Sequence, residues 1–189
     1  MHREPLLRLL AAYSPLDPAE WRAQAEIVAF VREQSDCFSR ALTVGHITGS
    51  AWVLNRDGSR VLLTHHRKLG KWLQLGGHAD GDSDVLSVAL REACEESGLS
   101  DIVPVTPEIF DVDVHIIPAR GSEPEHRHYD IRFLLQVLGD GCFQVSDESH
   151  ELAWVSQKEL LGLNPDASVV RMHGKWLKRR EGLRPAAAL

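Results

Sequence analysis

The sequence predicts a domain of the α/β class, and two observations support this prediction. From Gly45 onward, short apolar or alternating runs are separated by turn residues, a pattern typical of strands. Among these runs lies one amphipathic stretch, residues 83–97, which ends before Gly98 and has the pattern of a helix. With 189 residues and 43% hydrophobic content, the chain can bury one sizeable core.

Two helices are expected ahead of the strands. Residues 3–13 carry a leucine stripe, and the Pro-containing segment 14–18 interrupts it. Asp17 can cap a second helix that has Pro18 at its first position and runs to about Ser35. We therefore expect residues 1–42 to form an N-terminal helical extension.

The strands are expected to begin with a hairpin. Residues 50–54 and 60–64 have strand character and flank the turn Asn55-Arg-Asp-Gly58. A short strand at 71–75 is expected to lead into Gly76-Gly77. Later strands are expected at 108–117, 128–138 and 151–155, a loop at 120–126, and helices at 157–161 and 169–180.

Composition narrows the function classes. The net charge of −6 argues against stable nucleic-acid binding. Three widely spaced cysteines, Cys37, Cys94 and Cys142, favour a reducing compartment over a disulfide framework or a zinc site. The apolar run near the N-terminus is interrupted by Arg8. It is too short for a signal peptide or a membrane span. We expect a cytoplasmic protein that makes no membrane contact.

Three carboxylates gather at the end of the helix predicted at 83–97. Glu92, Glu95 and Glu96 lie three and four residues apart, so they share a helix face. They repel one another and oppose the negative end of the helix dipole, and Arg91 alone cannot neutralise them. A divalent cation would neutralise the three carboxylates. Their hard oxygen ligands suit Mg²⁺ or Mn²⁺.

The segment 77–99 resembles the Nudix box, whose pattern is G-x5-E-x7-R-E-U-x-E-E-x-G-U with U an aliphatic residue. The residues that match at the correct spacing are Gly77, Arg91, Glu92, Glu95, Glu96, Gly98 and Leu99, with Ala93 at the first aliphatic position. The segments GHITGSAWVL and LLTHHRKLGKWLQLGGH are similar to those of bacterial Nudix proteins of unassigned substrate.

One position departs from the pattern. Its first glutamate falls on Ser83, while Asp80 and Asp82 are close by. In the family this glutamate is less central to metal binding than the later three, so the departure concerns the geometry of the loop. Asp82, Ser83 or Asp84 could each cap the helix.

The resemblance implies a Nudix-like α/β/α sandwich with a mixed β-sheet. We expect it to span residues 43–160, with a C-terminal helix and tail, 161–189, packed on the same domain. It also implies metal-dependent hydrolysis of a nucleoside diphosphate linked to another group, by attack of water at phosphorus. The partner would be a small nucleotide or another diphosphate.

By the same resemblance, Glu92, Glu95 and Glu96 are the expected metal ligands, together with the carbonyl of Gly76. Arg91 is expected to orient the carboxylates, through a bidentate salt bridge. Glu95 is the first choice for the general base or a bridging ligand.

A further carboxylate is expected from a facing loop, since many Nudix enzymes use a loop glutamate. Glu148 and Glu151 both qualify, and the sequence does not separate them; either is equally consistent with an ordinary acidic loop.

Basic residues and histidines around the box are candidates for substrate contact. His78 and Gly77 border the expected metal site, and Arg67 and Lys68 could meet phosphates, although an exposed loop would also carry such residues. His126, His128 and Asp130 alternate and would face one side of a strand. That row could bind a metal or phosphate, and the alternative is a polar sheet face; His46 and His115 are expected to be structural.

Two other functions compete with hydrolysis. A Nudix-like nucleotide sensor is the alternative, but such domains often lose box glutamates. An isoprenoid-diphosphate isomerase would need a cysteine near residues 75–78, where this chain has none. The N-terminal helices could pack over the sheet, shape the pocket or form a homodimer contact. Prolines and Tyr129 downstream of the box lie at no spacing that identifies a substrate.

Overall fold

A mixed seven-stranded sheet forms the centre of the part of the chain that the structure describes, residues 2–67, 70–121, 123–145, 149–163 and 165–182 of a computed structural model. The strands are β1 (Gly45–Leu54), β2 (Arg60–His66), β3 (Lys71–Leu73), β4 (Leu75–His78), β5 (Ile102–Ile117), β6 (His126–Val137) and β7 (Ser149–Ser156). The main order is β3-β2-β1-β6-β5, and β4 pairs with β1 while β7 pairs with β2. The strand β1 runs parallel to β6 and antiparallel to β2 and β4.

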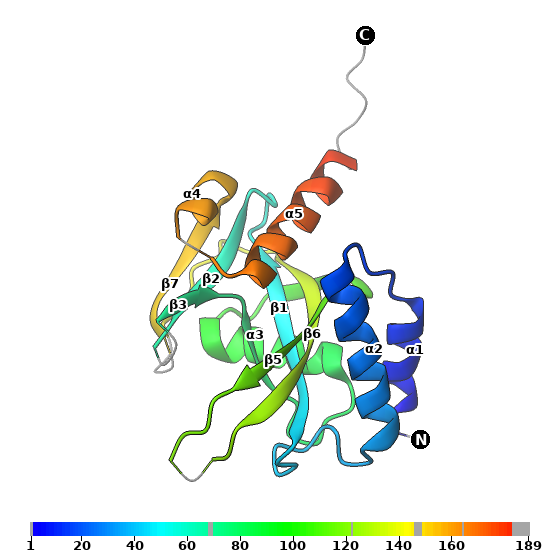
Figure 1. Cartoon of the computed structure of the whole chain (residues 1–189). Coiled ribbons are helices and arrows are strands. Elements are labelled where there is room, and N and C mark those ends of the chain that lie inside the picture. The colour runs from blue at the N-terminus through cyan, green and yellow to red at the C-terminus, as the bar shows by residue number, and fades with distance from the viewer. Residues whose placement is uncertain (1, 68–69, 122, 146–148, 164, 183–189) are drawn as a thin grey trace.

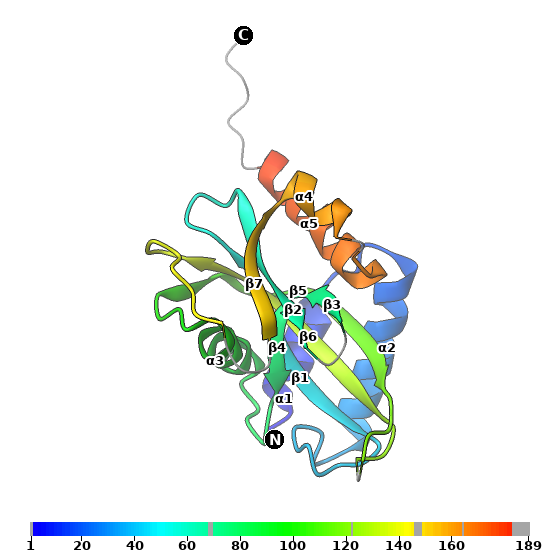
Figure 2. The ribbon, with the colours of Figure 1, turned by 90° about the vertical axis from the view of Figure 1, so that its left-hand side faces the viewer.

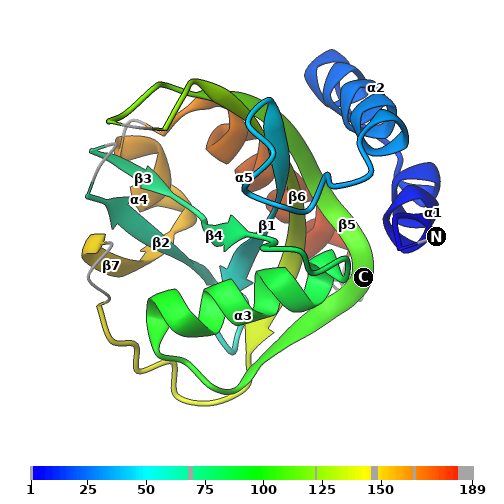
Figure 3. The same ribbon diagram turned by 90° about the horizontal axis from the view of Figure 1, so that it is seen from below.

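Helices cover both faces of this sheet. The helix α3 (Val85–Ser97) lies on one face, and α4 (Gln157–Gly162) and α5 (Ala167–Gly182) lie on the other (Figures 1 and 3). The helices α1 (Glu4–Ala12) and α2 (Pro18–Glu33) pack together (Figures 1 and 3), and α2 lies beside β5 (Figure 2). The predicted arrangement, a mixed sheet between helices with an N-terminal helical extension, is confirmed.

Alternation along β1 explains why the sheet has two cores. Ile47, Ala51 and Val53 face the core that holds α2 and α3. Trp52 and Leu54 point the opposite way, into a second core with residues of α5. Two helical layers can therefore bury apolar surface against one strand.

The start of β1 was harder to predict. We expected this strand from residue 50, but it begins at Gly45 and pairs along its whole length with β6. Its early residues His46, Thr48 and Ser50 are buried and polar. The apolar alternation that marks a strand is therefore absent from this half of β1.

The helix α2 follows the predicted capping chemistry. The Asp17 carboxylate accepts hydrogen bonds from the amides of Ala19 at 2.8 Å and Glu20 at 3.0 Å. Further along α2, the Phe30 ring stacks on Tyr129 of β6, with centroids 3.8 Å apart. Capping fixes where α2 begins, and the aromatic stack fixes α2 against the sheet.

A buried ion network joins the N-terminal and C-terminal helices to the sheet. Arg132 of β6 contacts Asp111 at 3.0 Å, and Arg171 of α5 contacts the same carboxylate at 2.9 Å. Lys175 of α5 lies 2.7 Å from Asp111 and also pairs with Glu20 of α2. Each buried charge thus has an opposite partner, as burial requires.

Candidate active site at the end of helix α3

The helix α3 begins and ends where its sequence signals place it. The Asp84 carboxylate caps it by accepting a hydrogen bond from the Ser87 amide at 3.2 Å. At the other end, Gly98 has a left-handed conformation with φ of 68°, and its amide donates to the Cys94 carbonyl at 2.8 Å. The glutamates at 92, 95 and 96 therefore lie in the last turns of the helix.

Two glycines let these glutamates approach β4 closely. The Gly76 amide donates to Oε2 of Glu96 at 3.1 Å. A Cβ atom on Gly77 would lie 2.3 Å from Oε2 of Glu92, so a larger residue here would force this carboxylate to move away from β4. The contacts bring Glu92 and Glu96 against consecutive residues of one short strand.

Arg91 ties the same helix to the end of β4. One guanidinium nitrogen, Nη1, lies 2.8 Å from Oε1 of Glu92 and 3.7 Å from Oε2 of Glu95. The other, Nη2, donates to the His78 carbonyl at 2.9 Å. The two terminal nitrogens of the Arg91 guanidinium thus contact different groups, carboxylates on one side and a backbone carbonyl on the other. They do not form the expected bidentate bridge to one carboxylate.

The donor set fits a hard divalent cation. Glu92 is 14% exposed and Glu95 is 61% exposed, so the cluster extends from the strand out to solvent. Carboxylate oxygens together with a backbone carbonyl are ligands that suit Mg²⁺ or Mn²⁺. Because Gly77 has no side chain, the Glu92 carboxylate can pack against β4. Gly76, whose carbonyl is the expected backbone ligand, is the neighbouring residue of that strand.

The acidic residues of the loop before α3 support the loop itself. Asp80 pairs with Arg40 at 3.2 Å, and Asp82 accepts the Asp84 amide at 2.9 Å. Of the three residues that could cap the helix, Asp84 is the one that does. The aspartates that flank Ser83 in this chain are thus engaged in local structure.

The remaining predicted residues lie outside β4 and α3. Arg67 is exposed in the turn after β2, and Glu151 is exposed on β7, where it pairs in register with His65. Lys68 and Glu148 lie outside the described residues. The structure therefore places Glu151 on a strand of the sheet, and its role in metal binding stays a prediction.

His78 points away from the glutamates. Successive residues of a strand face opposite sides, so its ring lies on the other face from Glu92. The ring centroid is 4.9 Å from that of His46 and 5.1 Å from that of His128. Burial, reinforced by Arg40, lowers the pKa of His78 to about 4.

The polar row predicted on β6 does share one face of the sheet. Asp130 accepts hydrogen bonds from the hydroxyls of Thr48 at 2.8 Å and Ser50 at 2.7 Å. His128 pairs in register with His46 on β1 and with His115 on β5. The sequence alone does not connect His46 with this row, because only strand register brings residues 46 and 128 together.

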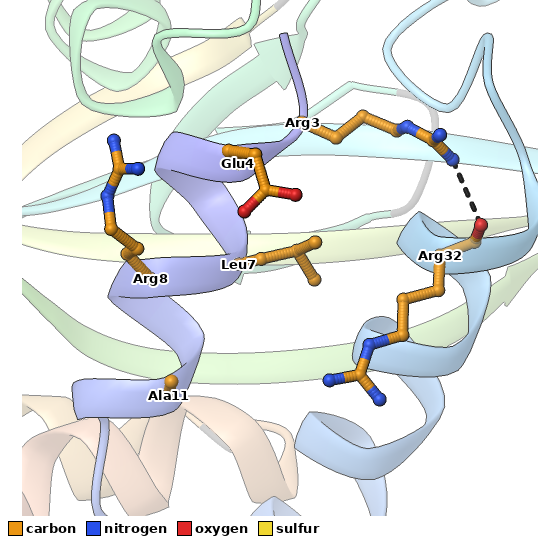
Figure 4. Close-up of a pocket in the computed structure, with 6 residues that line it drawn as sticks. All are labelled: Arg3, Glu4, Leu7, Arg8, Ala11 and Arg32. Carbon is orange, nitrogen blue, oxygen red and sulfur yellow. Dashed lines mark hydrogen bonds between the residues drawn. The ribbon is translucent and has the colours of Figure 1, made fainter. Parts of the chain in front are cut away.

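A separate pocket lies between α1 and α2. Its lining includes Arg3, whose guanidinium donates to the Arg32 carbonyl at 3.0 Å (Figure 4). The other lining residues are Glu4, Leu7, Arg8 and Ala11. No residue predicted from the sequence to take part in catalysis belongs to it.

Comparisons with known proteins identify the family of this chain. A family model described as NUDIX domain matches residues 46–178. A Mycobacterium tuberculosis protein named "Putative 8-oxo-dGTP diphosphatase 3" is 30% identical over 125 residues. The match covers 61% of this chain and 55% of that protein, so the chain spans about half the length of the curated relatives it matches.

Solved structures show the same fold. A Caenorhabditis elegans Ap4A hydrolase aligns with a TM-score of 0.59 at 16% identity, covering 72% of this chain and 98% of that one. A MutT protein from Methanosarcina mazei aligns with a TM-score of 0.54 at 24% identity, covering 76% of this chain and 99% of that one.

Among the described residues, no helix has the length and apolar character needed to cross a membrane. The family model covers most of the chain and includes the glutamate turn, and the chain belongs to the NUDIX domain family.

Proposed function

We propose that this protein hydrolyses the diphosphate linkage of a nucleoside diphosphate joined to another group, with a divalent cation as cofactor. One observation supports the proposal above all others. Glu92 and Glu96 pack against Gly77 and Gly76, at a point where a single added Cβ would collide with a carboxylate. A helix with a merely solvated acidic face needs no such close contact with a glycine strand.

Glu92, Glu95 and Glu96, with the Gly76 carbonyl, are the residues that would hold Mg²⁺ or Mn²⁺. When bound, such an ion neutralises charge on the phosphate oxygens and lowers the pKa of a coordinated water. The residues of the chain contribute positioning, because Arg91 holds Glu92 at 2.8 Å and anchors the helix to β4.

Glu95 is the candidate for proton transfer. Its side chain is 61% exposed and therefore accessible to water at the edge of the site. A carboxylate there can accept the proton that water loses as it attacks phosphorus. Glu151, Arg67 and Lys68 stay candidates for the facing side of the substrate, together with Glu148.

The substrate class follows from the chemistry of the site and from the relatives. A metal-carboxylate centre would bind the diphosphate, whereas residues outside that centre would select the group attached to the diphosphate. The matched M. tuberculosis protein is named for 8-oxo-dGTP, so oxidised deoxynucleoside triphosphates come first in our panel. Nucleotide sugars and dinucleoside polyphosphates complete it.

The test measures phosphate or nucleotide release from each member of that panel, with and without Mg²⁺ or Mn²⁺. We expect metal-dependent hydrolysis of at least one substrate and none after chelation. Binding of a nucleotide with no turnover across the panel would instead support a sensor and overturn the hydrolase. The matched control is Glu33→Gln, which removes an exposed glutamate from α2 and should leave turnover unchanged.

A further inference from the structure

Five histidines converge on one face of the sheet, away from the glutamates of α3. His46 of β1 pairs in register with His128 of β6, which pairs with His115 of β5. His126 precedes His128 by two residues on the same face, and its ring centroid is 5.0 Å from that of His46. His78 reaches the group from the end of β4. We call these residues the histidine cluster.

Three members of the cluster present their donor atoms to one another. One ligand atom from each of His46, His78 and His128 lies within 4.8 Å of the other two. Donors around a tetrahedral ion with Zn–N bonds of about 2.1 Å are about 3.4 Å apart. Small side-chain rotations would therefore close the three rings on a single ion.

The innermost ring has nitrogens that the protein leaves unsatisfied. His46 is 2% exposed, and neither Nδ1 nor Nε2 has a hydrogen-bond partner among the described residues. The backbone of Leu42 lies near the His46 ring and favours its protonated form, but it makes no hydrogen bond of good geometry with either ring nitrogen. His128 Nε2 is also buried without a partner in that part of the chain. Leaving such groups unpaired is costly, so they call for a ligand.

Neighbouring rings already have the contacts that orient metal-binding imidazoles. His126 Nδ1 lies 2.8 Å from the Pro124 carbonyl, which fixes the proton on Nδ1 and leaves a lone pair on Nε2. His115 Nδ1 lies 3.3 Å from the Asp113 carboxylate. Carbonyl and carboxylate partners of this kind hold an imidazole ready to coordinate through its other nitrogen.

We propose that the histidine cluster binds one borderline transition-metal ion, of the Zn²⁺ class, through His46, His78 and His128, with His126 as the nearest further donor. This site is separate from the glutamate turn, and it does not depend on the proposed hydrolase activity. Imidazole nitrogens suit zinc, copper, nickel and iron, whereas Mg²⁺ requires oxygen ligands.

The ligand chemistry of the three converging rings fits a metal. Burial is the main cause that lowers the pKa of His46, His78 and His128. Neutral imidazole is the form that coordinates metals. Arg40 is a positive charge beside these rings, because its Nη2 lies 2.6 Å from Nδ1 of His78, so a metal bound by His78 must displace that contact.

The test is a titration of the chelator-stripped protein with Co²⁺, followed by visible absorption. To remove cobalt binding at the carboxylates, the titration uses the Glu92→Gln/Glu96→Gln double variant alongside the wild type. We expect one equivalent of Co²⁺ with the intense bands of four- or five-coordinate cobalt in both proteins, displaced by Zn²⁺ and not by excess Mg²⁺.

Two cluster variants and one control decide the outcome. His46→Asn and His128→Asn should each weaken Co²⁺ binding at least 100-fold, and circular dichroism checks that both fold. His150→Asn changes an exposed histidine on β7 and should bind as the wild type does. Absence of the bands in the wild type, or their persistence in a folded His46→Asn/His128→Asn double variant, overturns the proposal. Loss of the bands in the Glu92→Gln/Glu96→Gln protein would also overturn it.

Discussion

The amide of Gly76 donates a hydrogen bond to Oε2 of Glu96, 3.1 Å away, and so fixes the end of α3 against the edge of β4. The acceptor of this backbone hydrogen bond is a side chain that is also a candidate metal ligand. The bond orients the carboxylate, which would lower the entropic cost of binding the proposed cation.

Replacing Glu96 by Gln tests this role. The amide oxygen can still accept from Gly76, so the fold should survive, but the negative charge is lost. We expect kcat to fall at least about 100-fold, equivalent to roughly 2.7 kcal/mol of transition-state stabilisation, with the midpoint of urea unfolding unchanged. Glu95→Gln should also remove most activity, and full activity in both variants would contradict the assignment.

The two glycines of β4 should respond differently to alanine. In Gly77→Ala the new Cβ would lie 2.3 Å from Oε2 of Glu92, which is the end of a side chain and can move away. We therefore expect activity to be lost while stability changes little.

In Gly76→Ala the Cβ would lie 2.6 Å from the Cα of Ser50, which is backbone, and φ is +153°. This variant should lose about 1–3 kcal/mol of unfolding free energy. Urea unfolding and turnover, measured on both variants, separate the two effects. Equal loss of stability in the two proteins would be inconsistent with this account.

Local signals predicted most of the fold. Asp17 caps α2 as expected, and Gly98 ends α3, because capping depends on residues a few positions apart. The start of β1 was missed because His46, Thr48 and Ser50 interrupt its apolar pattern. Those polar residues are buried by pairing with β6, some 80 residues away in sequence, as the Ser50–Asp130 hydrogen bond shows.

The candidate site divides in the same way. The spacing of Glu92, Glu95 and Glu96 on one helix indicates a cluster from sequence alone. The association of His46 with His128 depends on strand register, which a single sequence does not reveal. The same holds for Lys175, whose carboxylate partners lie on α2 and β5.

Lys175 should be essential for stability. In Lys175→Met, Asp111 keeps its contacts with Arg132 and Arg171, but Glu20 loses its cationic partner, and an uncompensated buried carboxylate costs about 3–5 kcal/mol. Urea unfolding measures the loss. The matched control is Lys178→Met, the same change at an exposed position of the same helix, which should stay within about 0.5 kcal/mol of the wild type. Similar losses of unfolding free energy in both variants would contradict a stabilising role for the buried ion network.

The histidine cluster should make the metal-free protein sensitive to acid. The pKa of His128 is about 2 in the folded protein and about 6.5 in the unfolded chain. Below pH 6.5 the unfolded chain takes up a proton that the folded ring does not, so stability is complete above that pH and falls as pH falls towards 2. The loss per such group is about 1.4 kcal/mol for each pH unit.

Urea unfolding at pH 7 and pH 5 measures this effect. We expect His128→Gln to lose about 2 kcal/mol less than the wild type between these two values. The control His150→Gln should lose as much as the wild type does. An identical loss in His128→Gln and the wild type would show that His128 does not contribute to the acid sensitivity.

Arg40 should compete with any metal at the histidine cluster. Its Nη2 lies 2.6 Å from Nδ1 of His78, and a guanidinium can only donate, so it occupies the lone pair of that nitrogen. Coordination through either nitrogen of His78 requires this bond to break, because a metal on Nε2 leaves a proton on Nδ1. Arg40 is 59% exposed and also pairs with Asp80, so it has a place to move to.

Arg40→Ala should therefore bind Co²⁺ about tenfold more tightly than the wild type, equivalent to about 1.4 kcal/mol. The gain comes from removing a donor that must otherwise be displaced, and from removing a positive charge beside the incoming cation. Arg56→Ala, in the turn between β1 and β2, is the matched control and should bind as the wild type does. Weaker binding in Arg40→Ala would mean that Arg40 organises the cluster, and would contradict the competition inferred from the contact with His78.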